Sequence, residues 1–396
     1  MHPPDESSEP VGVGVVLQCL LAAFAVLLLY SCLDSYAFAA LSGPKPSTWV
    51  LAVVGAAVAL LVSRPRRPVP LLGSPLLLWA GLYFAVTTIW ALWARAGPET
   101  SQITWDRYRS IGFLLACAII FDEARARRTG LVAVAAVAAF SSLLNVAEVA
   151  GYFKPVGEGF GSEGFVGRSS GLYGNPNASG TAIALGIMLA AEAAPVVLRV
   201  PLLAAAALGV VATFSRGSQL CLALAFLWLL WRKSLGRWTV VAAAALSVTG
   251  VIFAVQYLEA QDVLEPEHSA RLRFAKDDSG RAALAAKALG MFLDAPVGGK
   301  GLGATLTWDA EVSSHNMFLN LAGDHGVLGL LLFPALGAAL IAANRRSAPF
   351  VFLLMLAGIF SHNLLEDRYS LLLIALAASA GDVDRDRTEA ESIGTT

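Results

Sequence analysis

The sequence predicts an all-α integral membrane protein that crosses the bilayer about twelve times, within a range of about ten to twelve. Of its 396 residues, 57% are hydrophobic and 14% are charged, whereas a soluble domain carries about 45–50% apolar and about 25% charged residues. The apolar residues gather into stretches near the roughly 20 residues that a helix needs to cross a bilayer. A formal net charge of −1 lacks the basic excess of a nucleic-acid-binding protein, so no nucleic acid is expected as a partner.

The predicted membrane helices fall into two groups. Nine lie in residues 1–257 and three in residues 317–381, with a long outer loop at 258–316 between them. The chain ends in a tail at 382–396 that is expected to be disordered and cytoplasmic. The number is given as a range because the seventh segment is short and Pro334 interrupts the tenth. The segments are 12–33, 48–63, 71–93, 106–121, 129–150, 178–198, 200–214, 217–231, 238–257, 317–343, 349–364 and 368–381.

Basic clusters occur in alternate loops between the predicted helices. The positive-inside rule assigns such loops to the cytoplasm, which also puts both termini there. The first ten residues contain no Lys or Arg, and no small-residue cleavage site follows the first apolar stretch. That stretch is therefore expected to be retained and not removed as a signal peptide. The basic clusters lie at 64–67, 125–128, 199, 232–237 and 345–346.

The long outer loop contains a predicted amphipathic helix at 277–293. Asp and Ser residues at its start give a capping signal, and Leu284, Ala288 and Met291 follow at helical spacing. Arg281 falls in the first turn of this helix. Because one side is apolar and the other polar, the helix is expected to lie at the membrane surface.

Ionisable residues are almost absent from the middle of the predicted helices. This pattern argues against an ion-coupled transporter, whose bundle interior usually holds Asp, Glu or Lys. The unusual polar residues lie instead at the helix ends that the orientation assigns to the outer face. They are Arg168, Asn175, Asn177, Arg216, Arg281, His315, Asn316, His362 and Asn363.

Two of these residues have the chemistry of a phosphate-processing site. Arg216 stands in S-R-G between two apolar runs, where its guanidinium can bind phosphate through two hydrogen bonds or act only as an interfacial anchor. His315 opens an apolar run, with Ser313 or Ser314 as the expected helix cap. Its imidazole can accept a proton near neutral pH, or the residue can be a polar cap and nothing more.

Three further motifs have simple structural interpretations. Asn-Pro-Asn at 175–177 is a turn signal, and Glu366 and Arg368 can pair within a hairpin. The glycine-rich segment 295–303 lacks both a Ser/Thr after its Lys and a preceding strand, so we do not interpret it as a Walker motif. The four cysteines lie in apolar stretches without ligand spacing, which argues against a disulfide scaffold and a metal site.

Taken in order, these motifs resemble those of the O-antigen ligase and polymerase superfamily. The resemblance covers roughly residues 165 to 370, and the Ala-rich sequence after S-G-R departs from the aromatic residue that typical members carry there. The matching pieces are N-P-N at 175–177, S-R-G at 215–217, S-G-R and the glycine-rich segment within 279–303, H-N and G-D-H-G within 315–329, and a second H-N at 362–363.

The resemblance implies a GT-C-like membrane glycosyltransferase that uses neither a metal nor another cofactor. Its donor would be a glycan on undecaprenyl pyrophosphate at the outer face of the bacterial inner membrane, and its acceptor the lipid A core, with a periplasmic active site. By the resemblance, Arg216 binds the donor pyrophosphate and His315 is catalytic. Arg281 and Arg168 are weaker candidates for further pyrophosphate contacts. Supporting roles fall to Asn175, Asn177, Asn316 and His362.

The same resemblance leaves an alternative open. A polymerase of the superfamily would use a second lipid-linked glycan as its acceptor, and it would need the same donor site. A less favoured alternative is a flippase or transporter of lipid-linked glycans. Such a protein would need a polar path through the helix bundle, which the apolar helix centres do not offer.

Overall fold

The computed structural model describes residues 13–63, 74–93, 98–154, 168–232, 236–239, 241–245, 249, 281–307 and 314–379. Every regular element in these ranges is a helix, which confirms the predicted all-α class. The predicted tail at 382–396 and most of the predicted helix at 238–257 lie outside the described residues.

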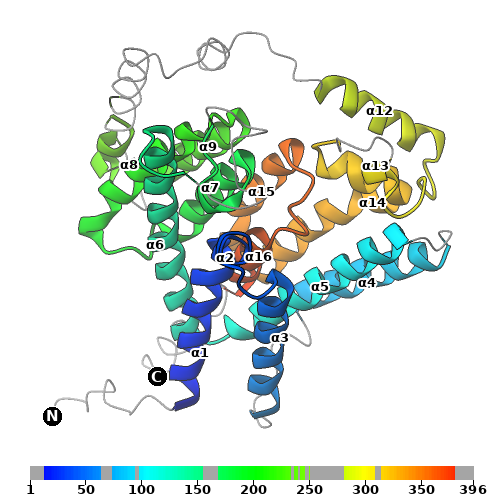
Figure 1. The fold of residues 1–396 in the computed structure, drawn as a ribbon, viewed down its shortest axis with the longest axis horizontal. Coiled ribbons are helices and arrows are strands. Elements are labelled where there is room, and N and C mark those ends of the chain that lie inside the picture. The colour runs from blue at the N-terminus through cyan, green and yellow to red at the C-terminus, as the bar shows by residue number, and fades with distance from the viewer. Residues whose placement is uncertain are drawn as a thin grey trace, which may run out of the picture.

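The described helices follow the predicted segments closely (Figure 1). Eleven of the twelve predicted segments coincide in whole or in large part with a helix, and two short α-helices, α2 and α13, were not predicted. In chain order the elements are α1 (Val13–Ala25), the π-helical η2 (Val26–Tyr30), α2 (Leu33–Leu41), α3 (Pro46–Ser63), α4 (Pro75–Trp93), α5 (Pro98–Ile120), α6 (Ala124–Val149), the 3-10 helix η4 (Gly171–Tyr173), α7 (Pro176–Ala190), α8 (Val196–Ala212), α9 (Arg216–Trp231), α12 (Arg281–Asp294), α13 (Ala304–Thr307), α14 (Met317–Ala343), η5 (Arg345–Ser347), α15 (Ala348–Phe360) and α16 (Arg368–Ser379).

Several of these helices are suited to a membrane. Within the described residues, five helical stretches are long and apolar enough to cross one, and α7, α8, α9 and α16 are shorter apolar helices. The chain is therefore consistent with a polytopic membrane protein. That the shorter helices also cross the membrane stays a prediction. The five long stretches are Val13–Tyr30, Pro46–Ser63, Pro75–Trp93, Ala124–Val149 and Met317–Ala343.

Contacts between helix ends divide the molecule into two sides. On one side, Arg127 near the start of α6 donates to the backbone oxygen of Ser379 at the end of α16. On the other side, Arg368 at the start of α16 pairs with Asp34 of α2, with 3.3 Å between Nη2 and Oδ1. Because neighbouring helices run in opposite directions, every second connection lies on the same side of the molecule. The pattern of basic loops predicts such an arrangement. Which side faces the cytoplasm stays a prediction.

The predicted segment 317–343 is not one continuous helix. Gly326 has a φ of 65° and a ψ of −146°, which interrupts α14 there and not at Pro334. This backbone conformation favours glycine, and a side chain at Gly326 would collide with the backbone oxygen of Pro296. Immediately after the interruption, the N–H of Val327 donates to that same oxygen at 2.8 Å.

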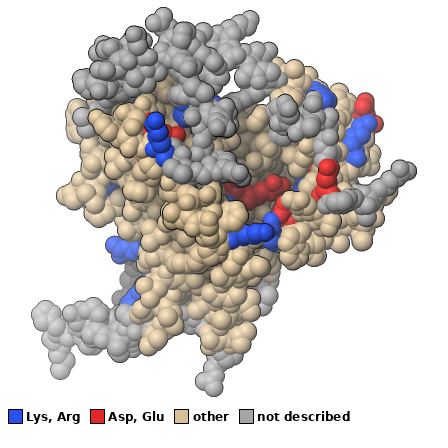
Figure 2. All heavy atoms as spheres, viewed as in Figure 1, with Lys and Arg blue, Asp and Glu red and all other residues tan. Residues whose placement is uncertain are grey.

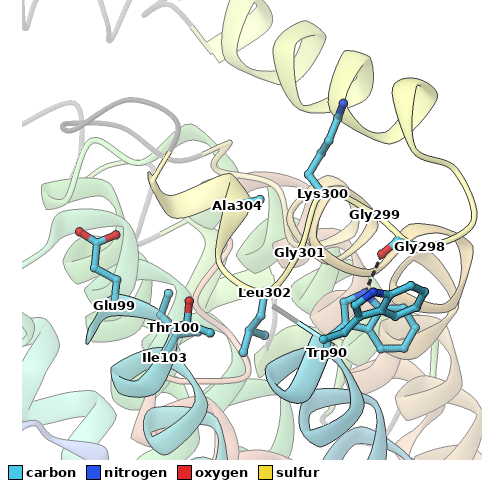
Figure 3. A pocket seen from close by; sticks show the side chains of 11 residues that line it. Trp90, Glu99, Thr100, Ile103, Gly298, Gly299, Lys300, Gly301, Leu302 and Ala304 are labelled. Atoms are coloured by element: carbon cyan, nitrogen blue, oxygen red, sulfur yellow. Dashed lines mark hydrogen bonds between the residues drawn. The ribbon is translucent and has the colours of Figure 1, made fainter. Parts of the chain in front are cut away.

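The glycine-rich segment 295–303 lies along this corner of α14. The N–H groups of Lys300 and Gly301 donate to the backbone oxygens of Gly323 (2.8 Å) and Asp324 (3.2 Å). From α4, Trp90 Nε1 donates to the oxygen of Gly298 at 2.6 Å (Figure 3). The segment therefore fixes the corner of α14 between α4 and α12.

A buried ion pair stands at the same corner. Arg107 of α5 and Asp324 of α14 are 2% and 0% exposed, and their Nη2 and Oδ2 atoms lie 2.7 Å apart. Asp324 also accepts hydrogen bonds from the N–H of Gly303 (3.0 Å), from the N–H of Thr305 (3.1 Å) and from Thr305 Oγ1 (2.9 Å). The expectation that helix interiors hold almost no charge is wrong here, because each charge has a partner in a different element.

We expect Asp324→Ala to destabilise the protein by about 3–5 kcal/mol, since it leaves the Arg107 guanidinium buried without its carboxylate. The matched control is Asp294→Ala, which breaks the exposed pair with Lys300 (3.2 Å) and should cost less than about 1 kcal/mol. Thermal unfolding in detergent measures both. Equal stability of the two variants would contradict the bracing role of Asp324.

Candidate functional site

The starts of α7 and α9 lie side by side and carry part of the predicted site. Arg168 is half-buried; its Nε donates to the backbone oxygen of Thr213 (3.1 Å) and its Nη2 to Asn177 Oδ1 (3.0 Å). Asn175 caps α7, its Oδ1 accepting from the N–H of Asn177 at 2.8 Å, as its turn signal predicts. The guanidinium of Arg168 is therefore fixed between the start of α7 and the turn that leads into α9.

Arg216 is the first residue of α9 and its side chain is exposed. A Cβ atom built on the next residue, Gly217, would lie only 2.9 Å from Phe360 Cγ at the end of α15. The absence of a side chain at Gly217 thus lets the start of α9 approach the end of α15. His362 follows two residues after Phe360, so this contact brings the S-R-G motif next to the second His-Asn motif.

The two histidines of the predicted site are in contact. The ring centroids of His315 and His362 lie 5.3 Å apart with an interplanar angle of 72°. Both side chains are half-buried. Burial and the neighbouring His315 lower the pKa of His362 to about 4, so this imidazole is neutral at physiological pH. A neutral ring beside His315 can orient it without competing for the same proton.

The cap of α14 differs from the expected one. Asn316 and not Ser313 or Ser314 is the N-cap, its Oδ1 accepting from the N–H of Leu319 at 3.1 Å. His315 therefore precedes the cap, with a left-handed φ of 49°. Such a backbone conformation is uncommon for a residue other than glycine. The side-chain oxygen of Asn316, a residue to which the resemblance assigns a supporting role, is thus used to cap the helix.

The helix that bears Arg281 lies on α14. Ala288 is fully buried, and Leu284 and Met291 are partly buried, so the predicted apolar side of α12 packs against protein. Lys287 is exposed on the other side of the helix. The predicted start at Asp277 and the side chain of Arg281 lie outside the described residues, so the placement of this arginine relative to the others stays a prediction.

In the hairpin between α15 and α16, Arg368 has partners other than Glu366, with which the sequence suggested that it could pair. Arg368 donates to Ser35 Oγ (2.6 Å) and pairs with Asp34, while the backbone N–H groups of Glu366 and Asp367 both donate to the oxygen of Asn363 at 2.8 Å. Charged side chains gather around this region. Figure 2 shows a hollow near the centre of one face, with Asp and Glu side chains in it and Lys or Arg at its edge.

Sequence reasoning missed the residues that hold these loops in place. Glu148, at the end of α6, accepts hydrogen bonds at Oε2 from the N–H groups of Ser170 (2.9 Å) and Gly171 (2.8 Å). Its position at a helix end before a long polar loop was visible in the sequence, but its partners lie more than twenty residues away. Asp34 was also visible in the sequence, as the acidic residue directly after the first apolar stretch, but its partner Arg368 was not.

The helices and the cluster of arginines and histidines at helix ends define a polytopic membrane protein with a polar site. The O-antigen ligase family model matches residues 201–334, which run from α8 into α14. This match supports the O-antigen ligase superfamily that the motifs indicated, and the apolar helices fit a membrane protein of the bacterial envelope. Ligases and polymerases of glycans make up this superfamily, which supports an enzyme of that general kind. No curated protein matches the chain.

The low pKa of His362 makes the stability of the fold depend on pH. Folded His362 binds its proton near pH 4, whereas an unfolded histidine does so near about 6.5. Between these values the unfolded chain binds the extra proton, so the free energy of unfolding falls as the pH is lowered from 6.5 to 4. Over this pH interval, we expect the free energy of unfolding of His362→Gln to fall by up to about 3 kcal/mol less than that of the unaltered protein. Thermal unfolding measures this difference. If the stability of both proteins changes with pH in the same way, the lowered pKa of His362 is contradicted.

Proposed function

We propose that this protein is an O-antigen ligase-type glycosyltransferase. It moves a glycan from undecaprenyl pyrophosphate to a hydroxyl of a lipid-anchored acceptor, the lipid A core, at the periplasmic face of the bacterial inner membrane. The observation that supports the proposal is a set of three contacts: Arg168 with Asn177 at the start of α7, Gly217 with Phe360, and His315 with His362. The match of residues 201–334 to the O-antigen ligase family model supports the same reaction class.

The donor pyrophosphate binds at the starts of α7 and α9 in this proposal. Helix N-termini carry a partial positive charge and unpaired N–H groups, which favour phosphate. Arg216 adds an exposed guanidinium that can bind phosphate oxygens through two hydrogen bonds. Arg168 is held in place by Asn177, and Arg281 adds a further contact. These cations stabilise the negative charge that grows on the leaving group, so they lower the barrier more than they strengthen donor binding.

His315 acts as the base in the transfer. The bond between the anomeric carbon and the pyrophosphate oxygen breaks while a bond to the acceptor oxygen forms, and the bonding electrons leave with the pyrophosphate. The acceptor's proton passes to His315, which releases it to water after the product departs. His362 holds the imidazole of His315 through their edge contact, and Asn316 fixes the start of α14 beneath it. The arginines supply the positive charge, with no metal or nucleotide sugar.

We expect Arg216→Ala and His315→Ala each to slow glycan transfer about a hundredfold, because each removes an interaction that strengthens in the transition state. Transfer by purified protein from a lipid-linked donor measures the effect. Arg345→Ala is the matched control, since Arg345 is an exposed arginine on the opposite side of the molecule and should leave transfer unchanged. Normal transfer by His315→Ala would reject His315 as the base.

A gene deletion distinguishes the ligase from the polymerase. In the deletion strain of a ligase, the lipid A core should carry no polymer while lipid-linked polymer accumulates. In that of a polymerase, the core should carry a single repeat. Electrophoresis of the surface glycan with extraction of the lipid-linked pool separates these outcomes, and a wild-type pattern of both would contradict the proposed function.

A further inference from the structure

Two cavities meet at the hairpin between α15 and α16. The larger one, of about 570 Å³, lies between the α2–α3 corner, α5 and α16, and Lys45, Arg109 and Phe113 contribute to its wall. The smaller one, of about 150 Å³, is bordered by Tyr173 and Ala178. Glu366 and Arg368 line both cavities. Of these two residues, Arg368 is engaged with α2, so Glu366 is the one whose charge is available to a ligand.

Glu366 differs from the other carboxylates around it. Asp324 accepts from four donors, Asp34 pairs with Arg368, and Asp106 pairs with Arg109. In the part of the chain that the structure describes, the carboxylate of Glu366 has no hydrogen-bond or ion-pair partner, although its side chain is open to the cavities.

The surrounding protein raises the pKa of Glu366, chiefly by removing water from around the carboxyl group. A carboxyl group in such a place gains from any ligand that brings hydroxyl donors, because they replace the water that it has lost.

The position of Glu366 connects the two cavities with the proposed donor site. Ala178, in the wall of the smaller cavity, directly follows Asn177, which holds the guanidinium of Arg168. Glu366 is also four residues from His362 in the same hairpin. A molecule in the larger cavity that passes Glu366 therefore approaches the residues of the proposed donor site.

The larger cavity has the mixture of groups that binds a sugar. Phe38, which is 43% exposed, offers apolar surface, and Glu366 offers a hydrogen-bond acceptor for hydroxyls. Lys45 is exposed and, within the described residues, its ammonium group has no partner. An ammonium at the rim attracts an anionic group such as a sugar-borne phosphate or carboxylate.

We propose that this cavity binds the acceptor glycan, with Glu366 accepting hydrogen bonds from its sugar hydroxyls and Lys45 contacting an anionic substituent. The proposal rests on the proposed transferase function and names the part of the site that receives the acceptor. A third cavity of about 620 Å³ lies beside Trp90 and the glycine-rich segment (Figure 3). Its Lys300 is paired with Asp294 and its Trp90 with Gly298, so it offers a comparison site on the same side of the molecule.

The test measures transfer kinetics of the full-length protein with a lipid-linked glycan donor and the lipid A core of the encoding organism as acceptor. We expect Glu366→Gln to raise the acceptor KM about tenfold, the effect of losing hydrogen bonds to a charged group, with the donor KM unchanged. Lys45→Ala should raise the acceptor KM severalfold. Glu99→Gln is the matched control, because Glu99 is an exposed carboxylate in the comparison cavity, and it should change neither KM.

The outcomes separate this proposal from the function on which it rests. No transfer by the unaltered protein overturns both. Transfer by the unaltered protein with an unchanged acceptor KM in Glu366→Gln overturns the acceptor site alone. If that variant fails to fold, Lys45→Cys decides, because its exposed position tolerates the change. Core oligosaccharide should slow maleimide labelling there and not at Lys300→Cys, and equal labelling at both positions overturns the proposal.

Discussion

The carboxylate of Asp324 is the group on which the arrangement of α5, α13 and the first part of α14 depends. It lies with zero exposure at the corner where α14 changes direction, and it binds Arg107 of α5, Gly303 just before α13 and Thr305 within α13. A buried guanidinium is tolerated only when a carboxylate compensates for its lost hydration. Because Arg107 has this partner, α5, α13 and α14 are fixed relative to one another in a region without water.

The direction of the first part of α14 follows from that corner, and with it the position of His315. Gly326 allows the sharp change of direction, and the segment 295–303 binds the backbone on either side of it. Asn316 then caps the helix and leaves His315 in a left-handed conformation, facing His362. The geometry of the proposed base is therefore determined by buried polar contacts that themselves take no part in binding.

Hydropathy was sufficient to predict most helices, since an apolar stretch of membrane length has few other stable conformations. It could not predict the interruption at Gly326, because the cause lies in a contact with Pro296, thirty residues earlier. Nor could it predict the pairing of Arg107 with Asp324, which are 217 residues apart in the chain. The histidines were each visible as polar residues at a helix end. Their mutual contact needed the packing of Gly217 on Phe360, which no local pattern encodes.

The distribution of charge suggests how two anionic lipids would be kept apart in the proposed site. The donor side offers guanidinium groups and helix N-termini, which attract pyrophosphate. On the acceptor side stands the carboxylate of Glu366, which repels the like charge of a pyrophosphate. Lys45 lies farther out, at the rim, and restores attraction only for an anionic group that stays away from Glu366. The carboxylate attracts a hydroxyl and repels a phosphate, so in the proposed site the residue that would bind the acceptor would also disfavour the donor on that side.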